Sequence, residues 1–143
     1  MSNLRKLSID DYEALCALWQ EAGLPYRPNG RDTRENIASQ IGGDYSIYLG
    51  AEEDGQLVGA ILGTHDGRKG WLNRLAVSPG HRGQGIAGTL VHAVEERLID
   101  LGIEIFACQI EDWNTTSMSI FDHLGYTRHD DIIYFTKRLR PEV

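Results

Sequence analysis

This chain of 143 residues has only two cysteines, and it has no run of apolar residues long enough to span a bilayer. Cys16 and Cys108 both lie in segments patterned like a protein core, which favours a packing role for each. Because no C-x-x-C or similar ligand spacing occurs, the sequence predicts no metal site. The first residues lead directly into an alternating segment without the pattern of a signal peptide. We therefore expect a cytoplasmic protein that has no membrane partner.

Basic residues are also scarce. The chain has 14 Lys and Arg against 21 Asp and Glu, a formal net charge of −7 at pH 7. This balance disfavours nucleic acid as a partner and keeps the protein soluble. It would also suit a cationic amine as ligand, although soluble proteins are often acidic for unrelated reasons. The length predicts one domain, residues 1–143, with a substantial core.

The chain lacks the G-x-x-x-x-G-K-[ST] motif of nucleoside-triphosphate loops. It has instead a glycine-rich turn, residues 82–88, between an apolar run that ends at Val77 and a long amphipathic segment. Glycines between a strand and a helix leave several backbone N–H groups pointing into one concavity, with the positive end of the helix dipole behind them. We therefore expect this loop to bind phosphate oxygens.

Two other interpretations of the loop exist. Gly83, Gly85 and Gly88 match the G-x-G-x-x-G spacing of dinucleotide-binding folds, and Glu111 or Asp112 lies near the position of a ribose-binding acid. However, only about 55 residues follow the loop, too few for the remaining strands and crossovers of a doubly wound sheet. A nicotinamide or flavin module is therefore disfavoured. The loop could also be a turn that merely joins a strand to a helix.

Periodicity and turn residues predict the elements along the chain. The expected strands are 4–9, 45–52, 56–64, 71–77, 103–110 and 132–139, and the expected helices run from Asp10 to Glu21, from Asp32 or Thr33 to about Gly42, from Gly85 to Leu101, and from Asn114 or Thr115 to Leu124. Asp54-Gly55 predicts a tight hairpin turn. The order βααβββαβαβ predicts an α+β (mixed α/β) fold, a mostly antiparallel twisted sheet flanked by helices.

Three segments carry a resemblance to a known family. Arg82-x-x-Gly85-x-Ala87 resembles the Q/R-x-x-G-x-G/A motif of the GNAT superfamily, the acetyl-CoA-dependent N-acetyltransferases. Leu75-Ala-Val-Ser-Pro resembles the strand before that motif, and residues 114–126 resemble the family's N-x-x-A-x-x-x-Y-x-x-x-G-F segment. The resemblance covers roughly residues 56–139. It implies a GNAT-like sheet in which the strands before and after the loop helix splay apart.

The resemblance also implies the acyl donor, acetyl-CoA, and no metal. Pantetheine would lie in the gap between the splayed strands like an added strand, paired with the backbone of residues 75–77. The N–H groups of residues 82–88 would bind the pyrophosphate. The residues expected to bind the cofactor are Leu75, Ala76, Val77, Arg82, Gly83, Gln84, Gly85, Ile86, Ala87, Gly88, Asn114 and Phe121. Asn114 also fits a helix N-cap, and the Arg82 side chain could instead point to solvent.

The chain departs from the family pattern at two positions that bear on chemistry. Phe121 stands where many relatives have a general-acid tyrosine, so water, Tyr126 or His123 would protonate the thiolate. We favour water, because a thiol with a pKa near 8.5 leaves as thiolate at a cost of about 2 kcal/mol at pH 7. Gln109 stands where some relatives have a glutamate. Glu111 shares its face of the strand and is the candidate general base, although it also fits an exposed strand end.

The implied reaction moves an acetyl group to a primary amine of a small molecule or of a protein or peptide N-terminus, by direct transfer in a ternary complex. The acceptor pocket is expected at residues 24–34 and near Tyr45, where Tyr26, Arg27, Arg31 and Arg34 are available. Dimers are common in the family, so a homodimer is one assembly that the resemblance implies. The alternative is a non-catalytic acyl-CoA-binding sensor of the same fold, which Phe121 and the missing glutamate motivate.

Overall fold

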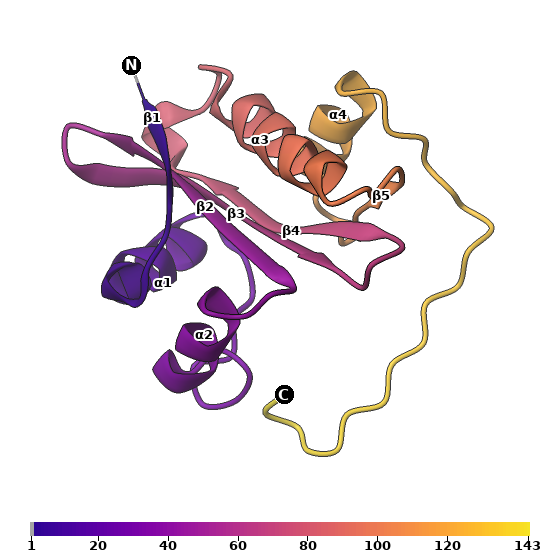
Figure 1. Cartoon of the computed structure of the whole chain (residues 1–143), viewed down its shortest axis with the longest axis horizontal. Helices are drawn as coiled ribbons and strands as arrows, with labels where there is room; N and C mark the ends of the chain where they lie inside the picture. Colours follow the sequence, from indigo (N-terminus) through magenta and orange to yellow (C-terminus); the bar gives the residue numbers. More distant parts are fainter. Residues whose placement is uncertain (1) are drawn as a thin grey trace.

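The computed structural model describes residues 2–143, which form a five-stranded sheet with helices on both faces (Figure 1). The strands are β1 (Asn3–Lys6), β2 (Ser46–Glu53), β3 (Gln56–His65), β4 (Gly70–Val77) and β5 (Phe106–Ala107), in that order across the sheet. The helices are α1 (Tyr12–Glu21), α2 (Arg34–Ile41), α3 (Ile86–Asp100) and α4 (Thr115–His123). All neighbouring strands are antiparallel except β4 and β5. The predicted fold class is confirmed.

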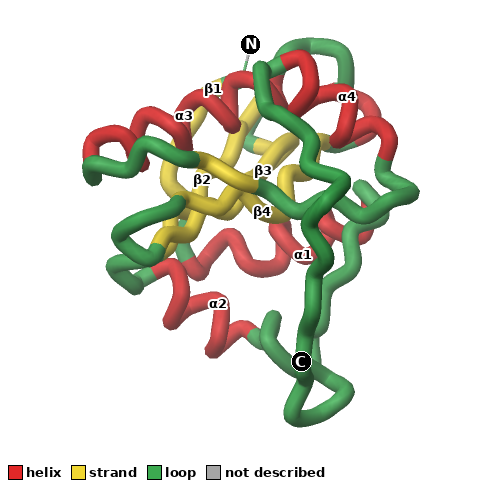
Figure 2. The backbone as a smooth tube through the Cα atoms, turned by 90° about the vertical axis from the view of Figure 1, so that its right-hand side faces the viewer, coloured by secondary structure: helices red, strands yellow, loops and turns green. Residues whose placement is uncertain are grey.

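The sheet divides the core into two layers. Helix α3 packs on one face through the predicted stripe of Ile86, Leu90, Val91, Val94 and Leu98, each at most 5% exposed. Helices α1 and α2 cover the other face, where Trp19 and Ile37 are buried. Figure 2 shows the sheet between these layers, with α3 and α4 on one side and α1 and α2 on the other.

Most of the predicted element ends are confirmed, because turn and cap residues mark them. The turn between β2 and β3 has Asp54 and Gly55 at φ of 53° and 76°, the left-handed pair that a two-residue hairpin requires. Thr33 and Asn114 accept hydrogen bonds as the N-caps of α2 and α4. Helix α1 ends at Glu21 as predicted, but the predicted start at Asp10 was wrong: Asp10 lies in a short 3-10 turn, Ile9–Asp11, which Ser8 caps and which leads into the helix at Tyr12.

Strand β4 contains a bulge at Arg74. Ala60 of β3 opposes Ala76, whereas Leu62 opposes Asn73, so β4 has one extra residue between these pairs. Arg74 lies at φ of 52°, a left-handed conformation that is unusual for a residue with a side chain. The extra residue reverses the alternation: Leu72 packs under α3, whereas Ala76 faces α1. The bulge therefore bends β4 just before the glycine loop.

Strand β5 is much shorter than the predicted 103–110. Only Phe106 and Ala107 pair with β4, opposite Gly70 and Trp71. Beyond this point the two segments separate, so that residues 108–112 and residues 72–75 of β4 line a common cavity. This early separation of β4 and β5 matches the splayed strand pair that the family resemblance implies.

The predicted last strand, 132–139, is not formed in the structure. Residues 131–140 are all exposed and belong to no helix or strand. Figure 1 shows this segment, in yellow, running clear of the sheet before its end returns near α2. The prediction of a strand here was wrong: residues 132–139 are rich in β-branched and aromatic residues, but such a segment becomes a strand only where another strand edge pairs with it.

Candidate active site

The glycine loop joins β4 to α3 through a second short 3-10 turn, Pro79–His81. Gly83 and Gly85 lie at φ of 78° and 79°, a conformation that glycine adopts without a steric cost. Gly85 is the N-cap of α3, and because it has no side chain it cannot cap the first N–H groups of the helix. The first N–H groups of a helix have no acceptor within the helix. The N–H groups of this turn therefore stay available to an anion.

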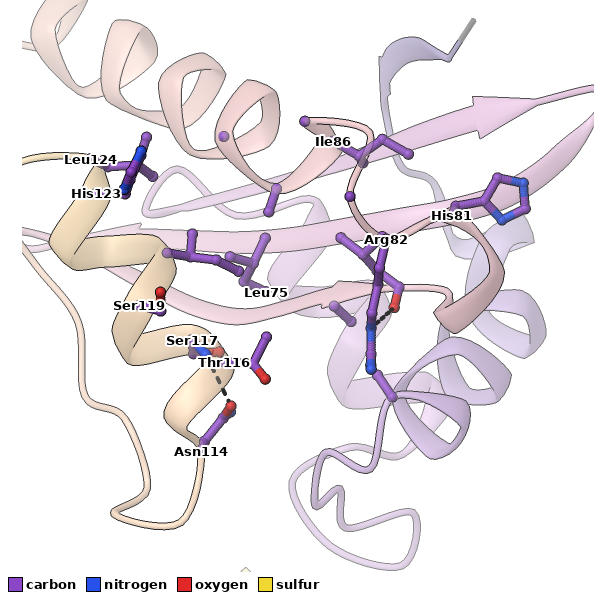
Figure 3. A pocket seen from close by; sticks show the side chains of 18 of the residues that line it. Leu75, His81, Arg82, Ile86, Asn114, Thr116, Ser117, Ser119, His123 and Leu124 are labelled. Atoms are coloured by element: carbon purple, nitrogen blue, oxygen red, sulfur yellow. Dashed lines mark hydrogen bonds between the residues drawn. The ribbon is translucent and has the colours of Figure 1, made fainter.

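A cavity of about 550 Å³ opens in front of this turn (Figure 3). Its walls come from the end of β4, the glycine loop and the facing side of α4. Most of the residues predicted to bind the cofactor line it: Leu75, Ala76, Val77, Arg82, Gly83, Gly85, Ile86, Ala87, Gly88 and Asn114. The Arg82 Nε donates to the Val77 carbonyl oxygen at 3.4 Å, which holds this cation at the cavity wall.

Two predicted cofactor residues do not line this cavity. Gln84 is exposed on the outside of the loop. Phe121 is 5% exposed and packs edge-on against Tyr126, with ring centroids 4.9 Å apart. It lines a neighbouring cavity instead. Phe121 is thus part of the core between α4 and the sheet.

A second cavity, of about 700 Å³, lies on the other side of the splay. Asn73, Arg74, Gln109, Glu111 and Asp112 contribute its polar wall, together with Arg31 and Tyr134 from the segments that cover it. Leu24, Leu75, Asn114 and Ser117 line both cavities. The two cavities therefore adjoin between β4 and the start of α4.

Asn114 and Ser117 stand at this meeting point. The Asn114 side-chain oxygen accepts from the Ser117 N–H at 3.1 Å, the bond drawn in Figure 3. The Asn114 N–H in turn donates to the Glu111 carbonyl oxygen at 2.9 Å. The cap thus uses the Asn114 oxygen and fixes the position of residue 111 relative to α4. The capping role that we expected for Asn114 is confirmed.

Among the candidate acids and bases, Tyr126 already forms a hydrogen bond with a residue outside the two cavities. Its hydroxyl donates to Oε2 of Glu95 on α3, and burial together with this carboxylate raises the pKa of Tyr126. A hydroxyl held in this way is a poor donor to a thiolate in the cavity. Glu111 is exposed in the second cavity, and His123 is exposed at the rim of the first. Burial raises the pKa of the Cys108 thiol to about 11, in keeping with the expected packing role.

The segment expected to form the acceptor pocket is held by one buried carboxylate. Asp32 is 2% exposed and accepts hydrogen bonds from Nη1 and Nη2 of Arg74 at 2.8 Å and from the Arg27 N–H at 2.6 Å. Tyr26 packs against Trp19, and Arg34 forms an ion pair with Glu13 outside the pocket. Of the four residues proposed for acceptor contacts, only Arg31 lines the second cavity.

Sequence reasoning missed three features of the site. Ser117, which stands at the alanine of the family motif, lines both cavities, and the exposed indole of Trp113 borders the first. The pairing of Asp32 with Arg74 was also missed, because 42 residues separate the two in the chain. A buried acid in a polar loop has no local signal, whereas the position of Ser117 three residues after the cap could have been noticed.

Comparison with known proteins identifies the family. The model of the acetyltransferase (GNAT) family matches residues 4–126. Acetyltransferase SG1711 from Sodalis glossinidius (strain morsitans) is 32% identical over 136 residues, which cover 95% of this chain and 94% of the relative. The chain therefore belongs to the acetyltransferase (GNAT) family and is an enzyme of the acyltransferase class.

Solved structures share the fold at lower identity. Aminoglycoside acetyltransferase AAC(6′)-Iy, in complex with the bisubstrate analogue CoA-S-monomethyl-acetylneamine, superimposes with a TM-score of 0.81 at 20% identity, covering 96% of this chain and 99% of the other. PaiA N-acetyltransferase from Thermoplasma acidophilum, in complex with coenzyme A, gives a TM-score of 0.81 at 23% identity, covering 92% and 93%. Both confirm the GNAT-like arrangement of the sheet and helices.

Two kinds of feature are absent from the described residues 2–143. No cluster of three or more His, Cys, Asp or Glu side chains is placed to hold a metal ion. No helix among these residues combines the length and the apolar character that crossing a membrane requires.

Proposed function

We propose that this chain, acting as a single domain in the cytoplasm, transfers an acetyl group from acetyl-CoA to a primary amine by direct attack in a ternary complex. The observation that carries the proposal is the meeting of two cavities at Leu75, Asn114 and Ser117. One cavity has the phosphate-binding turn at its far end, and the other has carboxylates and a half-buried polar strand. Donor and acceptor would approach each other from opposite sides of the splay.

Acetyl-CoA would occupy the first cavity. Its pyrophosphate would accept from the N–H groups of residues 82–88 at the positive end of α3. Pantetheine would continue along residues 75–77, adding to the free side of β4 where β5 has parted from it. This placement brings the thioester to the region that Leu75, Asn114 and Ser117 share. The CoA complexes of the PaiA and AAC(6′)-Iy structures support the same co-substrate.

The acceptor amine would enter the second cavity, and its deprotonation is the step that needs the protein most. A lysine-like amine with a pKa near 10.4 loses a proton at pH 7 at a cost of about 4.6 kcal/mol, and an α-amino group at about 1 kcal/mol. Glu111 is the candidate base, acting directly or through water. Water would protonate the thiolate, since Phe121 has no proton to give and the Tyr126 hydroxyl is held by Glu95.

The acceptor class that we propose is a small amine or a peptide N-terminus. Glu111 and Asp112 place two carboxylates in the second cavity that an amine could approach, beside Arg31, Arg138 and the Arg74 that pairs with Asp32. Several solved structures of similar fold are aminoglycoside N-acetyltransferases, which supports an amine-bearing acceptor. An amine-bearing acceptor also agrees with the net charge of −7 and with a protein that has no nucleic-acid partner.

The test is release of free thiol from acetyl-CoA with a panel of polyamines, aminoglycosides, amino acids and short peptides. We expect turnover with at least one cationic amine, and initial-rate patterns that intersect, as direct transfer requires. Binding of acetyl-CoA without turnover on any amine would favour the sensor of the same fold. Thermal stabilisation by NAD but not by acetyl-CoA would contradict both.

A further inference from the structure

The wall of the second cavity carries charged side chains of both signs. They are Arg31, Arg74, Arg138, Glu111 and Asp112. Asp32, which is 2% exposed, forms ion pairs with the first two of these arginines. Three cations and three carboxylates therefore gather around one space of about 700 Å³. A ligand that carries charges of both signs matches such a wall better than a ligand that carries positive charge alone.

Asp32 has one negative charge, and Arg74 takes most of its hydrogen-bonding capacity. Nη1 and Nη2 of Arg74 each donate to Asp32 at 2.8 Å, whereas Nε of Arg31 lies 3.8 Å from Oδ2, too far for a hydrogen bond. The Arg27 N–H occupies a further position on the same carboxylate, at 2.6 Å. The positive charge of Arg31 is therefore left without a hydrogen-bonded acid.

Both arginines keep unused hydrogen-bond donors. Within the described residues 2–143, Arg31 donates no side-chain hydrogen bond, and its side chain is 48% exposed in the cavity wall. A guanidinium has five N–H donors in a planar fork that fits a carboxylate. Arg74 uses two of its five on Asp32, and its side chain is 15% exposed. Two guanidinium groups that share one buried acid thus face the same cavity with donors to spare.

The free carboxylates lie on a different segment, close to the place where the two cavities adjoin. The Asn114 N–H donates to the Glu111 carbonyl oxygen at 2.9 Å, and Asn114 lines both cavities. Arg31 lines the second cavity alone and belongs to the loop between α1 and α2. The acidic groups are therefore tied to the side where the thioester is expected, and the basic group belongs to the loop that covers the cavity.

We propose that the acceptor is a zwitterionic amine, an amino acid or a short peptide, which places its carboxylate on Arg31 and Arg74 and its amino group beside Glu111. This inference rests on the proposed function, because the ligand is the acceptor of that transfer. The amine nitrogen bonds to the acetyl carbon as the carbon–sulfur bond breaks, its proton passes to Glu111, and coenzyme A leaves as the thiolate.

The two charged ends of such a ligand determine how it binds. Paired hydrogen bonds between a guanidinium and a carboxylate are strong and directional, and a few well-placed polar groups suffice to orient a ligand in a cavity. The carboxylate on Arg31 therefore directs the amino group toward the thioester. A polyamine has no group for the arginines, and its second cation would be repelled by them.

Arg138 extends the basic wall from the C-terminal residues. These residues rest on the same loop, because the Glu142 carbonyl lies against Gly30, the residue before Arg31. The Nε of Arg138 donates to the Val143 backbone oxygen at 2.8 Å. Since part of its fork is already engaged, Arg138 contributes mainly charge, and the carboxylate is assigned to the two arginines that Asp32 joins.

Binding to the complex with coenzyme A is the first test, because it needs no turnover. Calorimetry compares alanine with alaninamide, and dialanine with dialaninamide, pairs that differ in the carboxylate. A hydrogen bond to a charged group is worth a preference of about 10-fold or more. We therefore expect the acid of at least one pair to bind about 10-fold more tightly than its amide. Equal affinities, tighter binding of the amides, or no binding of either acid would overturn the proposal.

Variants of Arg31 test which side chain recognises the carboxylate. Arg31→Gln should reduce the preference for the acid about 10-fold, and Arg31→Lys, which keeps the charge without the planar fork, should retain part of it. Arg27→Gln is the matched control, because Arg27 is exposed on the same loop and lines neither cavity. Circular dichroism should show all three variants folded. A preference that survives Arg31→Gln, or that Arg27→Gln removes equally, would contradict the assignment.

Turnover separates this inference from the proposed function. Thiol release is measured with the same four acceptors and with putrescine, and the acids should have the higher kcat/KM. Arg31→Gln should remove this advantage through KM more than through kcat, as expected for a group that binds the substrate away from the reacting atoms. Preferred turnover of putrescine or the amides would contradict the zwitterion and support the transfer. Carboxylate-dependent binding without turnover of any amine would support the carboxylate site and contradict the transfer.

Discussion

Nη1 and Nη2 of Arg74 each donate to a carboxylate oxygen of Asp32 at 2.8 Å, and the same guanidinium lies 4.5 Å from the ring centroid of Trp19. The pair joins the bulge of β4 to the loop that covers the second cavity. It therefore links the bend that opens the sheet to the segment that we expect to meet the acceptor.

Asp32→Ala should be strongly destabilising, because it leaves the Arg74 charge without its partner in a mostly buried position. Breaking a buried ion pair from one side costs about 3–5 kcal/mol. Glu13→Ala removes the exposed pair with Arg34 and should cost at most about 1 kcal/mol. Urea unfolding measures both. Equal losses in the two variants would show that the buried pair does not organise this region.

Gly85→Glu should abolish acetyl-CoA binding, since it puts a carboxylate where the pyrophosphate is expected. Gly67→Glu is a matched control, because both glycines have φ near 80° and an added Cβ meets no atom within 4 Å at either site. Each change costs about 1–2 kcal/mol of left-handed strain. Gly67 lies in the turn between β3 and β4, away from the cavity. Calorimetry should find tight acetyl-CoA binding in the Gly67 variant alone, and tight binding by both would refute the phosphate loop.

Glu111→Gln should lower turnover and change its pH profile without weakening the binding of acetyl-CoA. General base catalysis contributes about 100-fold or more, which sets the scale of the loss. Glu96→Gln, an exposed acid on α3, is the control and should behave like the wild type. The readout is kcat against pH with the best amine of the panel. A variant with the wild-type pH profile would remove Glu111 as the base.

Cys108→Ala should retain turnover, because a thiol with a pKa of about 11 is almost fully protonated at pH 7 and cannot carry an acetyl group. The same burial makes the free energy of unfolding depend on pH in the alkaline range. The folded state keeps the thiol protonated more firmly than the unfolded state, whose pKa is 9.0, so this contribution is complete below pH 9 and is lost as the pH rises through about 11. Unfolding from pH 8 to 11 should therefore show a shallower decline in Cys108→Ala. An inactive variant that remains folded would indicate a covalent intermediate.

The parts of the fold that could be predicted are those with local signals. The apolar stripe from Ile86 to Leu98, the Asp54-Gly55 turn and the glycines at 83 and 85 each dictate a local conformation, and the structure has each of them. The bulge at Arg74 has no such signal, since arginine is not a residue that favours a left-handed conformation. It depends on the partner Asp32, which only the folded chain brings near.

The predictions of strands at 103–110 and 132–139 failed for a different reason. Both segments are rich in apolar residues, many of them β-branched or aromatic, but a strand's extent depends on the edge that it meets. Residues 108–110 turn away from β4 at the splay, and residues 132–139 meet no edge of their own sheet. The residues of a segment show that it can form a strand but not which strand it pairs with. Both predictions failed for this reason.

Hydrogen exchange at backbone amides, followed while coenzyme A is titrated, tests the proposed binding mode most directly. We predict strong protection of the amides of residues 82–88 and a smaller effect at residues 75–77, with the Asp66–Lys69 turn unchanged. Protection that falls elsewhere while the loop amides exchange as in the free protein would contradict the assignment of the glycine loop as the pyrophosphate site.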